Sequence, residues 1–304
     1  MPHDGGSCLG GLQLIPRPFE YHAPKTVREA VALLKQHRGE AKVLAGGQSL
    51  IPLMKLRILS PAHLVSLNGV KGLEYIRKEK GAVSIGALTR MADIESSELL
   101  RKECPILTEC AAQIADPLVR NLGTIGGNVS HADPTNDMPA VMVAWGADMV
   151  VVGPRGRRKV PASDFFRDTF TTAMAEDEIL TELSLPLVRR MGGAYLKLER
   201  QAGDYGIVGV AAGLWIGDDG RCVGCGIGLT GVGPTAIKAR RAEEALVGTK
   251  AGRVAIEEAA KRAAEDSKPT SDLRGSEEYK RDMVRVFAKR ALSLALKRAR
   301  SRSR

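Results

Sequence analysis

The sequence predicts an α+β protein whose last third forms a separate unit. Three observations support this. Strand-like and helix-like apolar spacings are mixed between residues 21 and 185, the run Gly217-Asp218-Asp219-Gly220 is a strong hairpin signal, and helical patterns dominate after residue 235. The chain has 304 residues, of which 44% are hydrophobic, as in ordinary globular proteins. It is therefore long enough for about two or three domains.

The first unit is expected over residues 17 to 70, after a leader over residues 1 to 16 that shows little periodicity. Thr26 and Glu29 have the spacing of a capping box, and apolar residues then recur at the helical interval until Gly39. The elements expected next are a strand over Lys42 to Ala45, a short helix over Ser49 to Leu56 interrupted by Pro52, and a strand over His63 to Leu67.

The second unit is expected over residues 71 to 190. Its predicted strands are Leu73 to Ile76, Ala82 to Ile85, Ala147 to Val152 and Ile179 to Leu185, and its predicted helices are Arg90 to Ile94, Pro105 to Ile114 and Met138 to Trp145. Asp137 stands just before the last helix, where its carboxylate can cap free N–H groups. Four basic residues, Arg155, Arg157, Arg158 and Lys159, crowd one expected turn.

The third unit, residues 191 to 304, should contain a three-stranded antiparallel sheet with helices on one side. The expected strands are Ala194 to Glu199, Ile207 to Ile216 and Arg221 to Leu229, and the expected helices lie near Thr235 to Leu246, Val254 to Asp266 and Ser276 to Lys297. The apolar face of the last helix should consist of Tyr279, Met283, Val286, Phe287, Ala291 and Leu294.

Two glycine-rich segments are candidate ligand sites. They are Ala45-Gly46-Gly47-Gln48-Ser49 and the run from Thr124 to Asp137, which contains Gly126-Gly127. Glycine has no Cβ, so its backbone can lie against a bulky group, and successive N–H groups in such a turn can hold phosphate oxygens without lysine or arginine. One glycine pair alone is usually a simple turn. Two pairs in polar surroundings favour a shared ligand.

Other motifs carry weaker signals. Gly226-Ile-Gly228-Leu-Thr-Gly231 has the form of a dinucleotide fingerprint, but Gly233 and Pro234 precede any helix, so a strand-to-helix loop is the better interpretation. Cys222 and Cys225 lack the second pair that a zinc or iron–sulfur site needs, and should pack as small apolar groups. No motif of hydrolases or kinases is present, and we predict no catalytic residues or metal ligands.

Three polar positions allow alternative interpretations. His131 could transfer a proton near a ligand or only hydrogen-bond its own loop. Lys197 alternates with Tyr195 and Glu199 on a predicted strand, a pattern typical of a solvent face. Tyr205 begins a glycine-containing bend and could present its ring to another flat ring.

Charge and composition restrict the partners and the compartment. The formal charge of +10 would attract nucleic acid, anionic cofactors or acidic proteins, but aromatic residues are only 4%, so stacking on single-stranded nucleic acid is not expected. The basic residues Lys297, Arg298, Arg300, Arg302 and Arg304 suggest a solvated tail. The sequence contains no membrane span or signal peptide, and its five cysteines form no disulfide framework. We expect a cytoplasmic protein that binds no nucleic acid.

Long motifs resemble a known family. Residues 42 to 57, KVLAGGQSLIPLMKLR, resemble the first flavin motif of the FAD-binding medium subunit of molybdenum hydroxylases, the relatives of aerobic carbon monoxide dehydrogenase and xanthine dehydrogenase. Residues 114 to 128, IADPLVRNLGTIGGN, followed by HADPTNDMPA at 131 to 140, resemble the second. The resemblance extends from Arg17 to the final helix and includes Gly-Val-Gly-Pro-Thr at 231 to 235.

The resemblance implies a fold and a set of cofactor contacts. The first two units would form a two-part FAD-binding domain of the PCMH/vanillyl-alcohol-oxidase type, with FAD in the cleft between them. The first glycine segment would wrap FAD, the second would hold its diphosphate, Leu180 would line the adenine side, and Lys197 and Tyr205 would approach the flavin ring. Gln48 replaces a histidine seen in some members. The implied cofactor-binding residues are Val43, Leu44, Ala45, Gly46, Gly47, Gln48, Ser49, Leu50, Ile114, Thr124, Ile125, Gly126, Gly127, Asn128, Asp137, Leu180, Lys197 and Tyr205.

The resemblance also implies an electron-transfer role. The chain would be an oxidoreductase subunit that takes electrons from iron–sulfur clusters in a small partner subunit, after oxidation of a substrate at the molybdenum cofactor of a large subunit. It would pass them to an external acceptor such as quinone, NAD or dioxygen, in a dimer of heterotrimers. The alternative is an autonomous FAD-dependent oxidase or dehydrogenase of a small organic substrate, which would need a pocket in the C-terminal domain. A third interpretation, as a nucleic-acid-binding or anion-binding protein, is supported by the charge of the chain alone.

Overall fold

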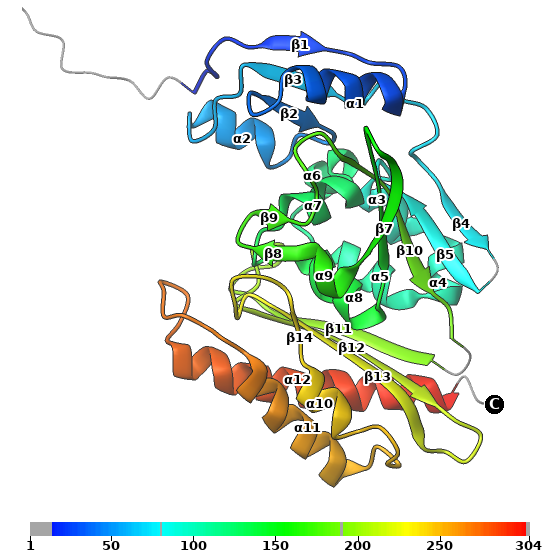
Figure 1. Ribbon diagram of the computed structural model, residues 1–304. Coiled ribbons are helices and arrows are strands. Elements are labelled where there is room, and N and C mark those ends of the chain that lie inside the picture. Colours follow the sequence, from blue (N-terminus) through cyan, green and yellow to red (C-terminus); the bar gives the residue numbers. More distant parts are fainter. Residues whose placement is uncertain (1–13, 80, 189–190, 302–304) are drawn as a thin grey trace, which may run out of the picture.

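The computed structural model describes residues 14–79, 81–188 and 191–301, and shows three stacked units (Figure 1). The upper unit contains a small sheet with two helices, the middle unit a larger sheet surrounded by short helices, and the lower unit a sheet covered by the long C-terminal helix. Most of the predicted leader, residues 1 to 13, lies outside the described residues. Among the described helices, none combines the length and apolar character that crossing a membrane requires.

The first unit is a three-stranded parallel sheet in the order β1-β3-β2. Its elements are β1 (Glu20–His22), α1 (Val27–Gln36), β2 (Ala41–Leu44), α2 (Leu50–Lys55) and β3 (His63–Ser66). Thr26 caps α1 as predicted, because its Oγ1 accepts a 3.1 Å hydrogen bond from the N–H of Glu29. The Glu29 carboxylate accepts instead from the N–H of Lys25, at 2.8 Å, so the capping box is only half formed.

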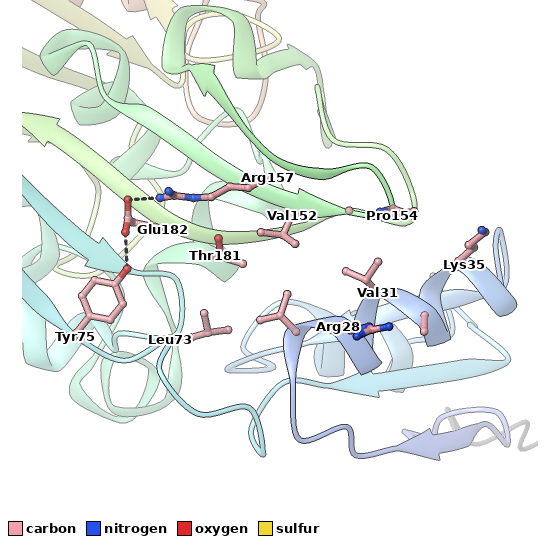
Figure 2. A pocket seen from close by; sticks show the side chains of 13 residues that line it. Arg28, Val31, Lys35, Leu73, Tyr75, Val152, Pro154, Arg157, Thr181 and Glu182 are labelled. Carbon is pink, nitrogen blue, oxygen red and sulfur yellow. Dashed lines mark hydrogen bonds and ion pairs between the residues drawn. The ribbon is translucent and has the colours of Figure 1, made fainter.

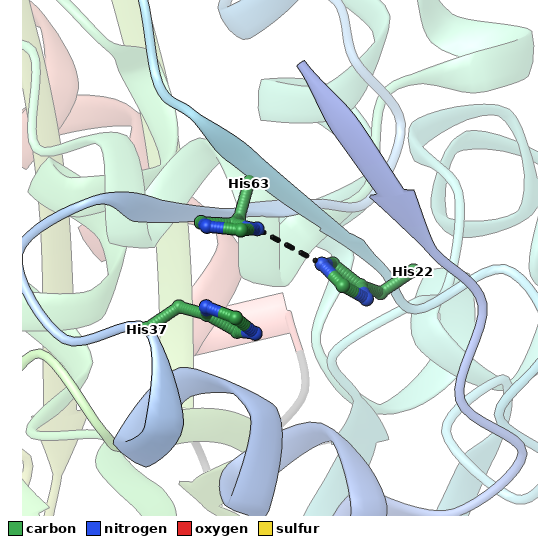
Figure 3. A group of neighbouring side chains, drawn as sticks. All are labelled: His22, His37 and His63. Carbon is green, nitrogen blue, oxygen red and sulfur yellow. Dashed lines mark hydrogen bonds between the residues drawn. The ribbon is translucent and has the colours of Figure 1, made fainter.

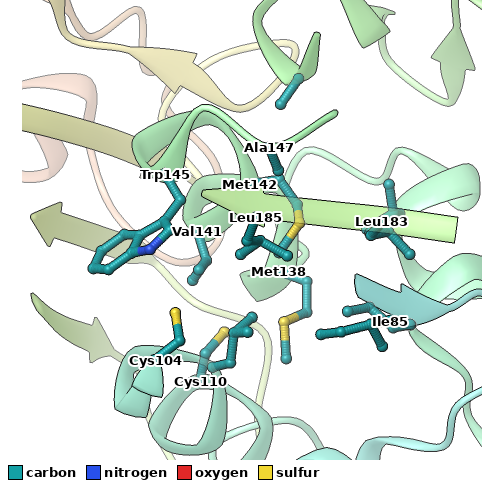
Figure 4. Close-up of a cluster of buried hydrophobic side chains, with 14 of the residues drawn as sticks. Ile85, Cys104, Cys110, Met138, Val141, Met142, Trp145, Ala147, Leu183 and Leu185 are labelled. Carbon is teal, nitrogen blue, oxygen red and sulfur yellow. The ribbon is translucent and has the colours of Figure 1, made fainter. Parts of the chain in front are cut away.

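The second unit is built on an antiparallel sheet in the order β4-β5-β10-β6-β7. The strands are β4 (Ile76–Glu79), β5 (Ala82–Gly86), β6 (Asp148–Gly153), β7 (Gly156–Pro161) and β10 (Ile179–Pro186), with a small pair β8 (Phe166–Asp168) and β9 (Thr171–Thr172). The helices are α3 (Met91–Ser96), α4 (Glu98–Glu103), α5 (Pro105–Ala112), α6 (Pro117–Leu122), α7 (Ile125–His131), α8 (Asp137–Trp145) and α9 (Ala162–Phe165). Every residue of α8 is buried, and Met138 and Met142 pack against Ile85, Leu183 and Leu185 of the sheet (Figure 4).

Several predictions for this unit were wrong. The first strand begins at Ile76, where the predicted strand ends. The basic residues Arg157 and Arg158 lie in β7 rather than in a turn, and pair with Glu182 at 3.2 Å and Glu178 at 2.6 Å. The pair Gly126-Gly127 lies in the first turn of α7 rather than in an open loop.

The third unit is an antiparallel sheet in the order β11-β12-β13-β14, covered by α11 and α12. Its elements are β11 (Met191–Leu198), β12 (Val208–Ile216), β13 (Cys222–Thr230), β14 (Ile237–Lys238), α10 (Arg240–Glu244), α11 (Arg253–Asp266) and α12 (Glu277–Ser301). The sheet therefore gains a fourth, two-residue strand beyond the three that were predicted. The two cysteines of the Cys-x-x-Cys motif are free thiols on β13.

The last helix differs from its prediction in two ways. Its buried face is Val284, Ala288, Ala291, Leu292, Ala295 and Ala299, offset by about one residue from the predicted face, so that Tyr279 is exposed. The helix also continues to Ser301, so part of the predicted tail is structured. Arg298 pairs with Glu109 at 2.7 Å, and donates to the carbonyl of Gly193 at 2.6 Å. Arg302 and Arg304 lie outside the described residues.

The second and third units meet where α8 packs on β13. A Cβ on Gly226 would lie 1.8 Å from the carbonyl oxygen of Ala144, and one on Gly228 would lie 2.0 Å from that of Ala140. The interpretation of this glycine run as a strand-to-helix loop was wrong, because Gly226 and Gly228 lie inside a strand. Both positions are glycine because the helix backbone occupies the space of a side chain.

Candidate functional site

The two glycine segments, which are about eighty residues apart in sequence, lie in direct contact. A Cβ on Gly46 would be 2.1 Å from the carbonyl oxygen of Leu122 and 2.8 Å from the Cα of Gly123. A Cβ on Gly127 would be 3.9 Å from the Cβ of Ala45. Glycine at position 46 therefore permits the loop after β2 to rest on the backbone that leads into α7.

The backbone N–H groups of the second segment are already used within the protein. Ile125 donates to the carbonyl of Thr89 at 3.0 Å, Gly126 to that of Ala87 at 2.8 Å, and Asn128 to that of Thr124 at 3.0 Å. Gly127 donates to Oγ1 of Thr124 at 3.1 Å. The four N–H groups from Ile125 to Asn128 thus have partners within the protein. The contact of this segment with a diphosphate stays a prediction.

The first segment has the opposite property. Within the described part of the chain, the N–H groups of Gly46, Gly47, Gln48 and Ser49 donate no hydrogen bond. They lie in the turn between β2 and α2, where Gly47 has a φ of +73°, and all four residues are only partly buried. Successive free N–H groups in a turn that combines right-handed and left-handed backbone conformations can bind an anionic oxygen.

Asn128 supplies a second unsatisfied group beside these segments. Its backbone carbonyl accepts a 2.8 Å hydrogen bond from Nδ2 of Asn136, which fixes the end of α7 next to the start of α8. Its side-chain Oδ1 is buried and has no hydrogen-bond partner among the residues that the structure describes. Because a buried acceptor is costly to leave unpaired, Oδ1 is suited to a donor group on a bound molecule.

A buried polar network connects α8 to β11. The Tyr195 hydroxyl donates to Oδ1 of Asp137, and Lys197 Nζ lies 3.3 Å from Oδ2 of Asp137 and 3.0 Å from Oε2 of Glu199. The prediction that these residues form a solvent-exposed face of the strand was wrong, because Tyr195 is buried and the Lys197 side chain is only 1% exposed. Asp137 likewise does not cap α8 through its side chain, since both of its oxygens are directed to these two partners.

Lys197 also positions two loops. Its Nζ donates to the carbonyl of Gln113 at 2.6 Å, beside Ile114, and to that of Asp204 at 3.0 Å, beside Tyr205. Tyr205 is 48% exposed, and the guanidinium of Arg274 lies 5.6 Å from the centroid of its ring. Lys197 therefore holds two predicted cofactor contacts in place while its own charge is balanced by carboxylates.

Burial raises the pKa of Asp137 from 3.8 to about 6, and the charge of Lys197 and the hydrogen bond from Tyr195 act in the opposite direction. Burial also raises the pKa of the Tyr195 hydroxyl, and the neighbouring Asp137 carboxylate adds to that rise. Tyr195 therefore remains a hydrogen-bond donor throughout the physiological pH range.

The raised pKa of Asp137 predicts a pH dependence of stability. Between about pH 4 and pH 6 the folded chain keeps a proton that the unfolded chain has lost, because the unfolded carboxyl has its ordinary pKa of 3.8. The contribution of Asp137 to the free energy of unfolding is complete below about pH 4 and is lost as the pH rises through 6, by about 3 kcal/mol over about two pKa units. Urea unfolding of the wild-type and D137N chains across this range measures the effect. The free energy of unfolding of the wild type minus that of D137N should fall as the pH rises. A difference that stays constant across this pH range would contradict the prediction.

Some predicted residues are not brought to this site by their side chains. Leu180 is buried in the core of the second unit, Leu44 is buried in a small core beneath α2, and the partly buried Leu50 packs against that core. Gln48 donates to the carbonyl of Gly46 at 3.2 Å. The ring of His131 packs against Phe170, with centroids 5.1 Å apart, and burial lowers the His131 pKa.

Sequence reasoning missed several residues of the site. Asn136, Tyr195 and Glu199 were not selected, although all three contact predicted residues. For Tyr195 a signal existed, because β11 is apolar at almost every position, which is typical of a strand covered on both faces. The strand indeed packs against α12 and α5.

A separate cavity of about 680 Å³ lies between α1 and the five-stranded sheet (Figure 2). Its wall includes Val31, Lys35, Tyr75 and Glu182, and the Tyr75 hydroxyl donates to Glu182 at 2.7 Å. None of the predicted cofactor-binding residues lines it. The cavity therefore does not coincide with the site formed by the glycine segments.

Comparisons with known proteins cover nearly the whole chain. The family model described as "FAD binding domain in molybdopterin dehydrogenase" matches residues 17–188, and that described as "CO dehydrogenase flavoprotein C-terminal domain" matches residues 193–295. The carbon monoxide dehydrogenase medium chain of Hydrogenophaga pseudoflava is 44% identical over 93% of this chain and 98% of its own length. The 6-hydroxypseudooxynicotine dehydrogenase complex subunit alpha of Paenarthrobacter nicotinovorans is 36% identical over 94% of this chain and 97% of its own length. A solved structure of carbon monoxide dehydrogenase from Hydrogenophaga pseudoflava, lacking the Mo-pyranopterin moiety, matches with a TM-score of 0.91 and 46% identity over 93% of this chain and 99% of that chain.

Proposed function

The chain belongs to the FAD-binding medium subunits of the molybdenum hydroxylases, and we propose that it is the electron-transfer arm of such an enzyme. The resemblance found in the sequence is confirmed, as are the α+β fold class, the FAD cofactor and the assignment to the oxidoreductases. Within the enzyme the chain would receive electrons from iron–sulfur clusters of a small subunit and deliver them to an external acceptor.

The residues present fit FAD. The free N–H groups of Gly46 to Ser49 match the anionic oxygens of a diphosphate, and the unpaired Oδ1 of Asn128 matches a hydroxyl or amine donor. FAD supplies the redox chemistry when it is bound, whereas the protein supplies binding and orientation. The first glycine segment is therefore the proposed diphosphate site, and the second packs closely against it and contributes the Asn128 side chain.

The remaining predicted residues take positioning roles in this proposal. Lys197 orders the backbone beside Ile114 and Tyr205, and Asp137 holds the Lys197 side chain. Two carboxylates face the single ammonium, so Lys197 is not a free positive charge that would stabilise a reduced flavin. Leu180 would reach the adenine side through its backbone, since its side chain is in the core.

The proposed partners are an iron–sulfur small subunit and a molybdenum-cofactor large subunit, in a cytoplasmic dimer of heterotrimers. One relative is named for carbon monoxide and another for 6-hydroxypseudooxynicotine, although both match nearly the full length of this chain. Because similar medium subunits occur in enzymes named for such different molecules, we infer that the substrate site lies on another subunit. We place the domain boundaries of this chain at residues 17 to 70, 71 to 190 and 191 to 304.

Two measurements test the proposal. The purified chain should absorb as a flavoprotein, and acid precipitation should release FAD that mass spectrometry identifies. In rapid mixing, the flavin of the complete three-subunit enzyme should be reduced by the substrate of the large subunit, whereas the isolated chain with the same substrate should stay oxidised. Rapid reduction of the isolated chain by a small organic substrate would instead establish an autonomous oxidase or dehydrogenase.

A further inference from the structure

Three of the five histidines of the chain meet in the first unit, and none belongs to the proposed FAD site. His22 ends β1, His37 follows the last residue of α1, and His63 begins β3. Figure 3 shows the three rings converging from these separate elements. One ligating atom from each lies within 4.8 Å of those of the other two.

The sheet register explains how this cluster forms. Glu20 and His22 are two residues apart on β1 and so share one face of the sheet, and Glu20 is paired directly with His63 on β3. The rings of His37 and His63 are stacked with centroids 3.7 Å apart, since α1 ends above the start of β3. A carboxylate and three imidazoles are thus placed together by the backbone.

The separations between these atoms suit the ligands of one metal ion. His22 Nε2 and His63 Nδ1 are 3.1 Å apart, and Glu20 Oε2 lies 3.4 Å from His63 Nδ1 and 3.9 Å from His22 Nε2. Two nitrogens bound to one tetrahedral zinc ion at about 2.0–2.1 Å are roughly 3.3 Å apart. The triangle of Glu20, His22 and His63 therefore has nearly the size of one face of such a site, with His37 close enough to complete it.

We propose that Glu20, His22, His37 and His63 bind one divalent transition-metal ion, for which zinc is the best match. Imidazole nitrogens with one carboxylate are typical zinc ligands, and four of them form a closed structural site. The position after the last residue of α1 also favours a cation, because the carbonyl end of a helix carries partial negative charge.

The site would have a structural role in the first unit. It joins the three-residue strand β1 to the end of α1 and to β3, and it connects His22 and His63, which are 41 positions apart in the sequence. Since binding to the folded state alone stabilises it, the ion would strengthen the attachment of this short edge strand. This inference is independent of the proposed electron-transfer role.

Zinc titration of the untagged full chain tests the proposal. The FAD-loaded protein, treated with EDTA and dialysed, is titrated with ZnSO₄ by calorimetry. One ion should bind per chain, and the thermal unfolding temperature should rise by several degrees. His22→Gln and His63→Gln should each weaken zinc binding at least tenfold, while the matched control His3→Gln/His131→Gln, which removes the other two histidines, should bind as the wild type does.

Circular dichroism and FAD content show whether each variant is folded. Folded His22→Gln and His63→Gln chains with weakened zinc binding would support the site. Three results would overturn it: no saturable binding by the wild type, unchanged affinity in both variants, or loss of binding in the control. In those cases the cluster is a stack of hydrogen-bonded rings without a metal function.

Discussion

The Gly127→Val variant is expected to fold and to be purified largely without FAD. A Cβ at this position would meet Oγ1 of Thr124 at 2.9 Å and then only Ala45, so the new side chain would enter the space between the two glycine segments. Gly127 lies in α7 with an ordinary φ, so the backbone accepts a side chain. Overpacking of this kind costs about 1 to 3 kcal/mol, which corresponds to a roughly 5- to 150-fold loss of FAD affinity.

The ratio of flavin to protein absorbance in the purified chain, followed by titration with added FAD, measures this effect. Gly252→Val is the matched control, because a Cβ on Gly252 meets nothing within 4 Å. Gly126 is unsuitable for the test, since a Cβ there would lie 2.6 Å from the backbone oxygen of Ala87 and would disturb folding. Full FAD retention by folded Gly127→Val would remove the proposed cofactor site from between the glycine segments.

Lys197→Met should cause the largest loss of stability among single substitutions at the site. Removal of the ammonium leaves the Asp137 and Glu199 carboxylates without their buried cation, and breaking a buried pair costs about 3 to 5 kcal/mol. The loss should be smaller at acidic pH, because Asp137, whose pKa is already about 6 beside Lys197, then carries a proton.

Urea unfolding at about pH 8 and pH 5 compares these conditions. The double variant D137N/K197M should recover part of the loss, since it removes one uncompensated carboxylate. Lys261→Met on the exposed face of α11 is the control and should change stability by no more than about 0.5 kcal/mol. A Lys197→Met chain as stable as this control would show that the network contributes nothing to the fold.

The parts of the fold that were predicted correctly are those controlled by local sequence. Thr26 and the apolar spacing after it defined α1, and the Gly217-Asp218-Asp219-Gly220 turn defined the β12–β13 hairpin. The short elements β1, α4 and α6 were missed, because three to six residues carry too little periodicity. β7 was missed because its basic residues are paired across the sheet with Glu178 and Glu182, which periodicity does not register.

The segments that form the candidate site could be predicted from the sequence, but the hydrogen bonds and charge pairs within it could not. Sequence could identify the two glycine pairs, but it could not show that Thr89 and Ala87 occupy the N–H groups of Ile125 and Gly126. It also placed Lys197 on a solvent face, because the partner that makes burial possible is Asp137, 60 residues away in the chain. Both features depend on hydrogen-bond partners that only the tertiary fold brings into reach.

The glycines of β13 also limit how this subunit can be recombined with its relatives. Because Gly226 and Gly228 admit the backbone of α8, the join between the two parts that the family models separate is a backbone-to-backbone contact rather than a flexible hinge. A chimaera that exchanges the C-terminal part would need small residues at the same two strand positions, whatever the length of the linker. Two parts that align separately with their relatives therefore constrain each other sterically. The contact positions are two residues apart on β13, Gly226 and Gly228, and four residues apart on α8, Ala140 and Ala144.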